Sequence, residues 1–265
     1  MAFEHSTGDR RHQMRKLFTA EGRLALQAVM RLEPLLAFDF DGTLAPIVDH
    51  PDHAHARESV SPLLARLGQR LPVAILTGRR VADVRKRLGF EPAHVIGSHG
   101  AEDEARPAAA SDGSALDALR GRIGERAGEL RGSGVGIEDK HHSLAFHYRL
   151  APDPAQALAC IDAVLADPLP GLRRFGGKAV VNIVAAGDPD KGDALLALAQ
   201  RLNAQAAVFF GDDVNDEAVF ERAPSHWLTV RIGTDDPRSR AMFFLDSDED
   251  LPRVLEDMLA LFGRA

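Results

Sequence analysis

The sequence predicts an α/β protein with a Rossmann-like core, built on a parallel sheet, and an inserted smaller α+β domain. Two observations lead to this prediction. Short apolar runs alternate with amphipathic helical patterns toward both ends of the chain, as in a parallel sheet with helices on its faces. Between residues 106 and 185 the order changes to helix, two strands, helix and two strands, which indicates an antiparallel insertion.

The chain is expected to begin with a polar N-terminal extension at 1–30, which carries a modest helical pattern. The catalytic core then covers 31–105 and resumes at 186–265, so that it is interrupted in sequence. In its first part we expect strands at 35–38, 73–76 and 95–96 and helices at 58–71 and 80–88.

The insertion covers 106–185 and opens with a segment at 106–114, whose Ala, Pro, Ser, Asp and Gly residues predict a linker. Its expected helices are 115–130 and 154–165, and its expected strands are 136–139, 144–150, 172–175 and 179–184. After it we expect helices at 191–202 and 251–262 and strands at 207–210, 228–232 and 242–245.

Composition limits the classes of function. The chain has 265 residues, of which 45% are hydrophobic, and contains no apolar run long enough to span a bilayer. Its net charge of -7 argues against nucleic acid as a partner, because a phosphate backbone needs a basic surface. The single cysteine, Cys160, excludes an intrachain disulfide and favours the cytoplasm. The oligomeric state stays open.

Two aspartates directly follow the first buried strand, in the string Asp39-Phe40-Asp41-Gly42-Thr43. Residues i and i+2 of an extended segment point to the same side, so the two carboxylates are expected to face one site. Gly42 lets the chain leave the strand in a turn. An acidic surface turn would explain one aspartate well and two convergent ones poorly.

This opening string resembles the haloacid-dehalogenase superfamily. The resemblance implies that Asp39 is a nucleophile that attacks phosphorus, and that Asp41 protonates the leaving oxygen and later deprotonates the hydrolytic water. A covalent intermediate divides one slow hydrolysis into two easier steps. The resemblance therefore implies a phosphatase that acts through an aspartyl phosphate.

Two later strings occupy the family's next positions. Thr77-Gly78-Arg79 follows the strand at 73–76, where a hydroxyl and free N–H groups at a helix start favour an anion. Asp190-Lys191-Gly192 opens the helix after the insertion. Taken alone, these residues fit an ordinary helix cap and a solvated lysine. The resemblance implies catalytic roles for Thr77 and Lys191 and phosphate binding by Gly78 and Arg79.

The fourth string, Gly211-Asp212-Asp213-Val214-Asn215-Asp216, is strongly acidic and follows the strand at 207–210. Carboxylates this close repel one another unless a cation lies among them. Mg²⁺ prefers oxygen ligands and usually takes one or two carboxylates. We expect Mg²⁺ to be held by Asp39, the Asp41 carbonyl and Asp212, with Asp213 and Asp216 behind them as orienting groups.

Further strings narrow the expected substrate to a sugar phosphate. The order of elements in the insertion resembles the caps of sugar phosphatases, so the insertion is expected to be a substrate-binding cap. The segments 97–102, 138–140, 147–149 and 177–183 resemble trehalose-6-phosphate phosphatases. The resemblance implies hydrolysis of trehalose 6-phosphate. The residues expected to bind the substrate are Gly42, Thr43, Gly78, Arg79, His99, Gly100, Glu102, Glu138, Lys140, His147, Arg149 and Asn182.

Other interpretations remain open from the sequence. A phosphatase for another sugar phosphate, of the sucrose-phosphate or mannosylglycerate-phosphate type, would carry the same core strings. A catalytically dead binding module would be expected to have lost Asp39, Asp41, Lys191 or Asp212, and all four are present. Asn182 and Asn215 stand where the family often has Glu and Thr, and Glu138 with Lys140 also fits a solvated cross-strand pair.

Overall fold

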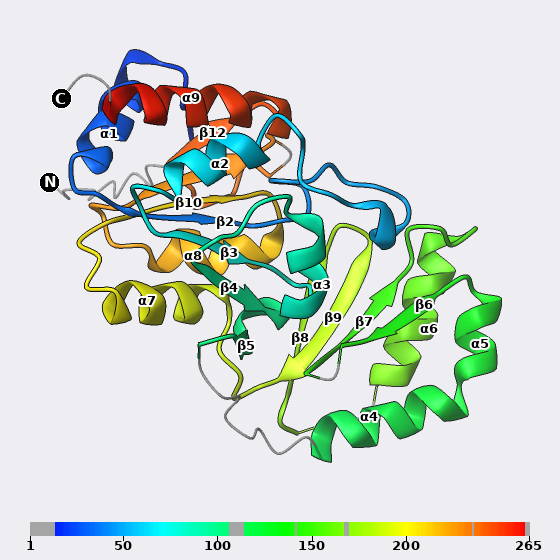
Figure 1. Cartoon of the computed structure of the whole chain (residues 1–265). Coiled ribbons are helices and arrows are strands. Elements are labelled where there is room, and N and C mark those ends of the chain that lie inside the picture. The colour runs from blue at the N-terminus through cyan, green and yellow to red at the C-terminus, as the bar shows by residue number, and fades with distance from the viewer. Residues whose placement is uncertain (1–13, 106–113, 141, 167–169, 235, 263–265) are drawn as a thin grey trace, which may run out of the picture.

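Two β-sheets organise the residues that the computed structural model describes, which are 14–105, 114–140, 142–166, 170–234 and 236–262. The larger sheet has eight strands in the order β1-β12-β11-β10-β2-β3-β4-β5. The smaller has four, in the order β6-β7-β9-β8. Figure 1 shows the larger sheet with its helices at the upper left and the smaller one at the lower right.

The larger sheet is parallel except at β5, which runs antiparallel to β4. The central strands β2 and β10 are fully buried, so neither face of the sheet is open to water. In spatial order the strands are β1 (Arg15–Lys16), β12 (Phe243–Leu245), β11 (Leu228–Ile232), β10 (Ala207–Gly211), β2 (Leu35–Phe38), β3 (Val73–Leu76), β4 (His94–Gly97) and β5 (Glu102–Asp103).

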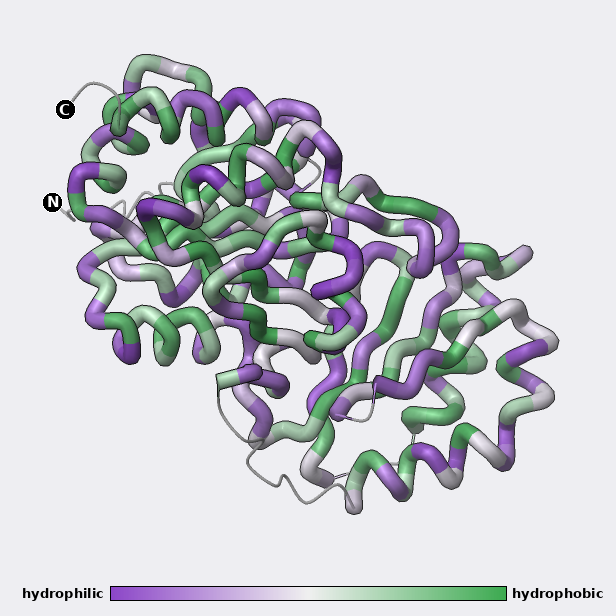
Figure 2. The backbone as a smooth tube through the Cα atoms, in the orientation of Figure 1, coloured by the Kyte–Doolittle hydropathy of each residue, from purple (hydrophilic) through white to green (hydrophobic). Residues whose placement is uncertain are grey.

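Helices cover both faces of this sheet (Figure 1). On one face lie α1 (Ala20–Met30), α2 (Ser61–Leu67) and α9 (Leu251–Phe262), and α9 contacts both of the others. On the other lie α7 (Lys191–Arg201) and α8 (Glu217–Arg222), and the short α3 (Val81–Val84) follows β3. Figure 2 shows the hydrophobic residues concentrated in the strands between these layers, which is the pattern of an apolar core.

The smaller unit, residues 114–185, is an antiparallel sheet with helices on one face. Its strands are β6 (Gly136–Asp139), β7 (Ser143–His147), β8 (Leu172–Gly177) and β9 (Val180–Ala185), and its helices are α4 (Ser114–Glu125), α5 (Ala127–Gly132) and α6 (Pro154–Leu165). The helices pack on an apolar cluster of their own, which includes Leu119, Phe146 and Ile161. The opposite face of the sheet is turned toward the larger sheet (Figure 1).

The predicted fold class is confirmed, and most strands lie within two residues of their expected bounds. The helix expected at 115–130 is two helices, because the backbone of Arg126 leaves helical geometry at φ -107° and ψ 13°. The helix expected at 58–71 is shorter, since it starts only at Ser61 beside a proline and is followed by Gly68. Strands β1 and β5 and helix α8 were not predicted, and all three are too short for a periodic signal.

The end of the N-terminal extension is part of the larger sheet. β1 pairs with β12, and Leu17 and Leu26 are buried in the core cluster. Residues 1–13 and most of the expected linker, 106–113, lie outside the described residues. Within the described ranges every helix is too short or too polar to cross a membrane.

We expect the central strands to account for much of the stability. Phe38 and Phe210 are fully buried on neighbouring strands, with ring centroids 5.2 Å apart. Phe38→Ala should lower the free energy of unfolding by about 3–5 kcal/mol, because the cavity left among packed neighbours cannot collapse fully. Leu24→Ala is the control, since Leu24 is 65% exposed on α1, and should change it by less than about 0.5 kcal/mol. Similar losses for both variants in urea unfolding would contradict this expectation.

Candidate active site

The carboxyl ends of three parallel strands bring the core strings together. Asp39 follows β2, Thr77 follows β3 and Asp212 follows β10, and these strands are neighbours in the sheet. Lys191 is the first residue of α7, whose start is fixed by a capping box between Asp190 and Asp193. This is the edge at which open α/β sheets bind ligands.

Lys191 is buried between two carboxylates. Its Nζ lies 2.8 Å from Asp39 Oδ1 and 2.8 Å from Asp216 Oδ1. Burial lowers the pKa of the ammonium group, but the charges of Asp216 and Asp39 outweigh it and leave that pKa above its usual range. Lys191 therefore stays positively charged beside the Asp39 carboxylate.

The pKa values of Asp39 and Asp212 are both raised, and burial is the largest cause for each. Lys191 opposes the shift at Asp39, whereas Asp216 and Asp212 add to it. Lys178 opposes the shift at Asp212, whose pKa rises to about 7. The site thus holds more negative charge than its lysines neutralise, and this favours a further cation.

Asp216 orients its neighbours. Its Oδ2 accepts hydrogen bonds from the backbone N–H groups of Asp212, at 2.8 Å, and of Asp213, at 2.9 Å, while Oδ1 accepts from Lys191. Burial also raises the pKa of Asp213, whose Oδ1 accepts a hydrogen bond from the Val214 N–H. Asp216 thus contacts both Asp212 and Lys191, whereas the orienting role expected for Asp213 stays a prediction.

The donor set fits a hard divalent cation. Carboxylate oxygens of Asp39, Asp212 and Asp216 lie within 4.8 Å of one another, and Oδ1 of Asp212 is buried without a hydrogen-bond partner among the described residues. Such an oxygen is costly to bury unless it binds something. Because both oxygens of Asp216 are already engaged, Asp39 and Asp212 are better placed as ligands.

The turn after β2 needs glycine at position 42. Gly42 has φ +85°, and a Cβ there would stand 2.1 Å from Oδ2 of Asp212. The backbone of one acidic string thus passes directly beside the carboxylate of another. Its conformation also presents Asp41 at the edge of the site, where the Asp41 side chain is 39% exposed.

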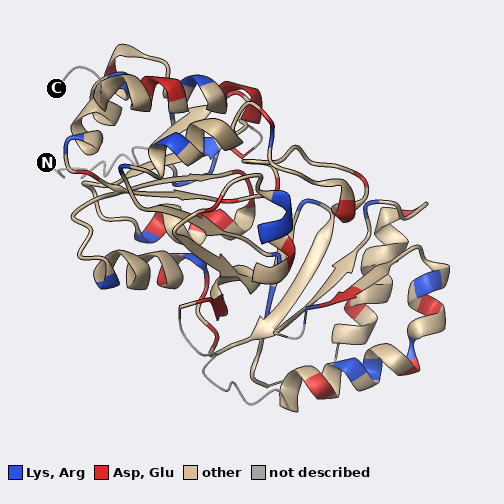
Figure 3. Ribbon diagram, viewed as in Figure 1, with Lys and Arg blue, Asp and Glu red and all other residues tan. Residues whose placement is uncertain are grey.

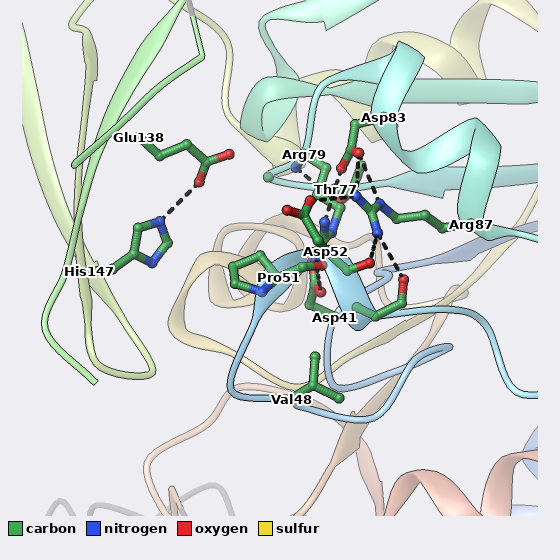
Figure 4. A network of polar contacts seen from close by, with 12 residues as sticks. Asp41, Val48, Pro51, Asp52, Thr77, Arg79, Asp83, Arg87, Glu138 and His147 are labelled. Carbon is green, nitrogen blue, oxygen red and sulfur yellow. Dashed lines mark hydrogen bonds and ion pairs between the residues drawn. The ribbon is translucent and has the colours of Figure 1, made fainter. Parts of the chain in front are cut away.

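Asp41 is held by Arg79. Nε of Arg79 lies 2.8 Å from Oδ2 of Asp41, and Nη2 lies 2.7 Å from Oδ1, so the pair is bidentate (Figure 4). Thr77 is fully buried, and its Oγ1 accepts a hydrogen bond from the Arg79 N–H. The structure therefore pairs Arg79 with the predicted acid/base, although the sequence predicted it to be a phosphate contact.

A cavity of about 410 Å³ extends from these residues toward the smaller unit. This volume is in the usual range for a small-molecule site. From the core it is lined by Asp39, Asp41, Gly78, Arg79, His99, Lys191, Asp212 and Asp213. All five residues predicted in the smaller unit also line it, namely Glu138, Lys140, His147, Arg149 and Asn182.

Those five residues differ in what they contact. Glu138 accepts a hydrogen bond from Nε2 of His147 at 2.9 Å (Figure 4), and Lys140 is 3.5 Å from the same carboxylate. Burial raises the pKa of Glu138, but His147 and Lys140 more than offset this and lower it. Lys140 also donates to the Gly78 carbonyl at 3.0 Å, which links the smaller unit to the core. Arg149 donates to the Val48 and Lys178 carbonyls.

His99 is a buried, neutral histidine at the cavity wall. Its pKa lies well below the usual value, chiefly through burial and then through the nearby charges of Lys140 and Lys191. Asn182 lies near the ring and opposes the shift, but neither ring nitrogen has a partner at hydrogen-bond geometry within the described residues. The ring contacts Phe175 edge to face.

Four of the predicted substrate contacts do not line this cavity: Gly42, Thr43, Gly100 and Glu102. Glu102 is used elsewhere, because its Oε2 accepts from the Val81 N–H at 3.1 Å and from Ser98 Oγ at 3.2 Å. It therefore supports the start of α3, and we do not retain it as a substrate contact. Thr43 is fully buried beneath the turn.

Lys178 lies in the site but was not predicted from the sequence to belong to it. It lies between β8 and β9, and its Nζ is 2.6 Å from Oδ2 of Asp212. The string Gly177-Lys178 was noticed, but only the pairing of two distant strands shows that this hairpin reaches the core. Residues 47–51 were also missed, and they line the cavity with Ile47, Val48 and Pro51.

Comparisons with known proteins agree on one family. The model of the family described as Trehalose-phosphatase matches residues 37–248. A trehalose-phosphate phosphatase of Mycobacterium tuberculosis is 32% identical over 255 residues, which cover 91% of this chain and 65% of the relative. The corresponding protein of Mycobacterium marinum is 33% identical over 88% of this chain and 64% of its own. The chain thus spans about 65% of the length of these curated relatives.

Solved structures share the fold. The C-terminal domain of the C. albicans trehalose-6-phosphate phosphatase superposes with a TM-score of 0.76 at 22% identity, covering 96% of this chain and 99% of that domain. A trehalose-6-phosphate phosphatase related protein gives 0.70 at 22% identity, over 86% of this chain and 99% of that protein.

The raised pKa of Asp212 predicts a pH dependence of stability. Burial raises the pKa of this carboxyl group to about 7 in the folded protein, whereas its pKa in an ordinary environment is 3.8. The stability that the proton of this group contributes is present below that ordinary value and is lost as the pH rises through about 7. We expect the free energy of unfolding of Asp212→Asn, relative to that of the parent, to rise by about 2–4 kcal/mol between about pH 4 and pH 8. The measurement is urea unfolding with a chelator present.

Glu256→Gln, on the exposed side of α9, controls for general effects of pH. A stability difference between the Asp212→Asn variant and the parent that stays constant across this pH range would contradict the prediction.

Proposed function

The chain belongs to the trehalose-phosphatase family, and we propose that it hydrolyses trehalose 6-phosphate to trehalose and phosphate. The observation that carries the proposal is the arrangement around Asp39. A buried carboxylate is paired with Lys191 at the end of a central strand and opens into a cavity lined with polar groups from the smaller unit. The family supplies the substrate class and the geometry supplies the chemistry.

In the first step, an oxygen of Asp39 attacks phosphorus and the bond from phosphorus to the sugar oxygen breaks. Asp41 donates a proton to that oxygen, so trehalose leaves neutral and the phosphoryl group stays on Asp39. Lys191 keeps a positive charge beside the reacting carboxylate throughout. We propose that Thr77 and the Gly78 N–H bind the phosphate oxygens, as the family resemblance implies.

In the second step, Asp41 takes a proton from a water molecule, which attacks phosphorus and releases phosphate from Asp39. The same group therefore gives and regains one proton in each cycle. We propose that Mg²⁺ is held by Asp39, the Asp41 carbonyl and Asp212; when bound, it would offset negative charge on the phosphate. Asp216 holds the backbone of Asp212 and the ammonium group of Lys191, and an orienting role for Asp213 stays a prediction.

The smaller unit is proposed to act as a cap that recognises the sugar. Glu138, His147 and Asn182 offer acceptors and donors for hydroxyl groups, and Lys140 and Lys178 add positive charge. The proposed domain bounds are those expected from the sequence, with the cap at 106–185. Cytoplasmic location also stays a prediction, as does the absence of nucleic acid among its partners.

Another sugar phosphate is the alternative substrate. Asn182 is buried on the cavity wall, and it has no charge where the family often has a carboxylate. A substrate with a different pattern of hydroxyl groups, such as a sucrose or mannosylglycerate phosphate, would also find a neutral donor and acceptor there.

The direct test is release of phosphate from a panel of sugar phosphates in the presence of Mg²⁺. We expect trehalose 6-phosphate to give the highest kcat/KM and a chelator to abolish its hydrolysis. Asp39→Asn should lower turnover at least about 1,000-fold while the protein stays folded, because uncatalysed phosphate ester hydrolysis is extremely slow. A higher kcat/KM for another sugar phosphate would replace the proposed substrate, and full activity of Asp39→Asn would overturn the mechanism.

Glu138 should matter for the sugar and not for the phosphate. Glu138→Ala is expected to lower kcat/KM for trehalose 6-phosphate about 30- to 200-fold, the effect of losing a charged hydrogen bond to substrate, and to leave an aryl phosphate within about threefold. Lys140→Ala is the comparison, because Lys140 also links the two units through Gly78 and should impair both substrates. Equal losses on both substrates for Glu138→Ala would exclude a sugar-specific role.

A further inference from the structure

Arg79 has its nitrogens committed to protein acceptors. Nε and Nη2 bind the two oxygens of Asp41, and Nη2 also donates to the Pro51 carbonyl at 2.9 Å. Nη1 donates to Oδ2 of Asp83 at 3.0 Å. The guanidinium also lies over the ring of Phe40, 5.4 Å from its centroid. These contacts use four of the five N–H donors of an arginine and leave the group 10% exposed.

Asp83 fixes Arg79 from behind. Its other oxygen, Oδ1, accepts from Arg87 Nε at 2.9 Å and Nη2 at 2.7 Å, and Arg87 Nη1 in turn holds the Asp52 carbonyl at 2.6 Å (Figure 4). Arg79 is therefore part of a chain of contacts from α3 to the loop at 50–54. Such a chain restricts the guanidinium plane as well as its position.

Asp41, by contrast, has a fixed backbone and an otherwise free side chain. Its backbone is set by the bridge to Ala45 and by the Gly42 turn, but the side chain is 39% exposed. Without Arg79, nothing among its hydrogen bonds in the described residues would select one orientation of the carboxylate. A proton donor that must reach the leaving oxygen loses rate steeply when its geometry is not fixed.

We propose that Arg79 is a positioning residue, which holds the Asp41 carboxylate in one orientation for its acid and base steps and does not bind the substrate phosphate. The inference rests on the function proposed above. Another cation, Lys191, is available to the phosphate, because it forms an ion pair with the nucleophile Asp39. Arg79 acts through Asp41, and the planar fork of its guanidinium is what the role requires.

Arg79→Lys tests this role because it keeps the charge and removes the fork. Lysine is a point charge that cannot hold both carboxylate oxygens in one plane. We expect kcat for trehalose 6-phosphate to fall about 10- to 100-fold and KM to change by less than about threefold. A phosphate-binding arginine would instead raise KM, and lysine would rescue much of that loss.

Arg85→Lys is the matched control. Arg85 makes a bidentate pair of its own, from Nε and Nη2 to the two carboxylate oxygens of Glu104, and neither side chain lines the cavity or contacts the side chains of Asp41 or Asp83 in the described residues. The control variant should stay within about threefold of the parent in kcat and KM. Thermal unfolding of both variants reports any general loss of structure. If the control variant loses as much kcat as Arg79→Lys, the role of Arg79 is structural only.

The leaving group supplies an independent readout. Nitrophenolate leaves without needing a proton, so its release from 4-nitrophenyl phosphate in a single turnover should fall less than about fivefold in Arg79→Lys. In an Asp41→Asn background, Arg79→Lys should add less than about twofold, because it acts through a group already removed. If that background has no measurable rate, the leaving-group comparison decides.

Four results would overturn the proposal: a kcat for Arg79→Lys near that of the parent, an equal loss of kcat in the control variant, the same loss for both leaving groups, or the same loss with and without Asp41. Each of these leaves the proposed phosphatase activity standing. A parent protein that releases phosphate from no sugar phosphate would contradict the proposed function instead, and this inference would fall with it.

Discussion

Lys191 lies buried between Asp39 and Asp216, with Asp212 close by. The cluster therefore contains three carboxylates and one ammonium group, and the surrounding structure has to offset the excess of negative charge. Burying one carboxylate without a partner costs several kcal/mol, so three near one lysine need further compensation. Part of this compensation comes from the hydrogen bonds that Asp216 accepts from two backbone N–H groups. Another part comes from Lys178 of the smaller unit, which binds Asp212. The positions of α7, of the acidic string after β10 and of the β8–β9 hairpin all follow from that need.

The same cluster explains why the core could be read from the sequence. Asp39 and Asp41 are two residues apart after an apolar strand, and Asp212 and Thr77 also follow such strands, so local pattern and sheet topology place them at one edge. The smaller unit was predicted as an insertion because its order of elements breaks the alternation. Two of its strands, β7 and β9, are marked by runs of mostly apolar residues.

Contacts between distant segments could not be predicted in this way. The Arg79–Asp41 pair, the Lys140–Gly78 bond and the Lys178–Asp212 pair depend on side-chain directions that follow from strand register and hairpin reach. Glu102 shows the opposite error: a polar residue near the site whose carboxylate supports α3. Figure 3 shows why charge pattern alone misleads, since acidic and basic residues occur along helices and loops of both units. Strands β1 and β5, of two residues each, are too short for any periodicity.

The pairing of β1 with β12 has a consequence for the order in which the molecule is assembled. Arg15 lies beside Phe243, so the edge of the larger sheet joins two segments that are far apart in the sequence and are therefore synthesised at different times. The smaller unit, by contrast, is continuous in sequence and has its own apolar cluster, which is complete before β10, β11 and β12 are made. During translation it is therefore expected to be folded while β2, β3 and β4 still lack the strand β10 that covers one side of β2. The nascent chain thus carries an exposed sheet edge for the time needed to synthesise β10, and this interval is when the protein is most prone to aggregate.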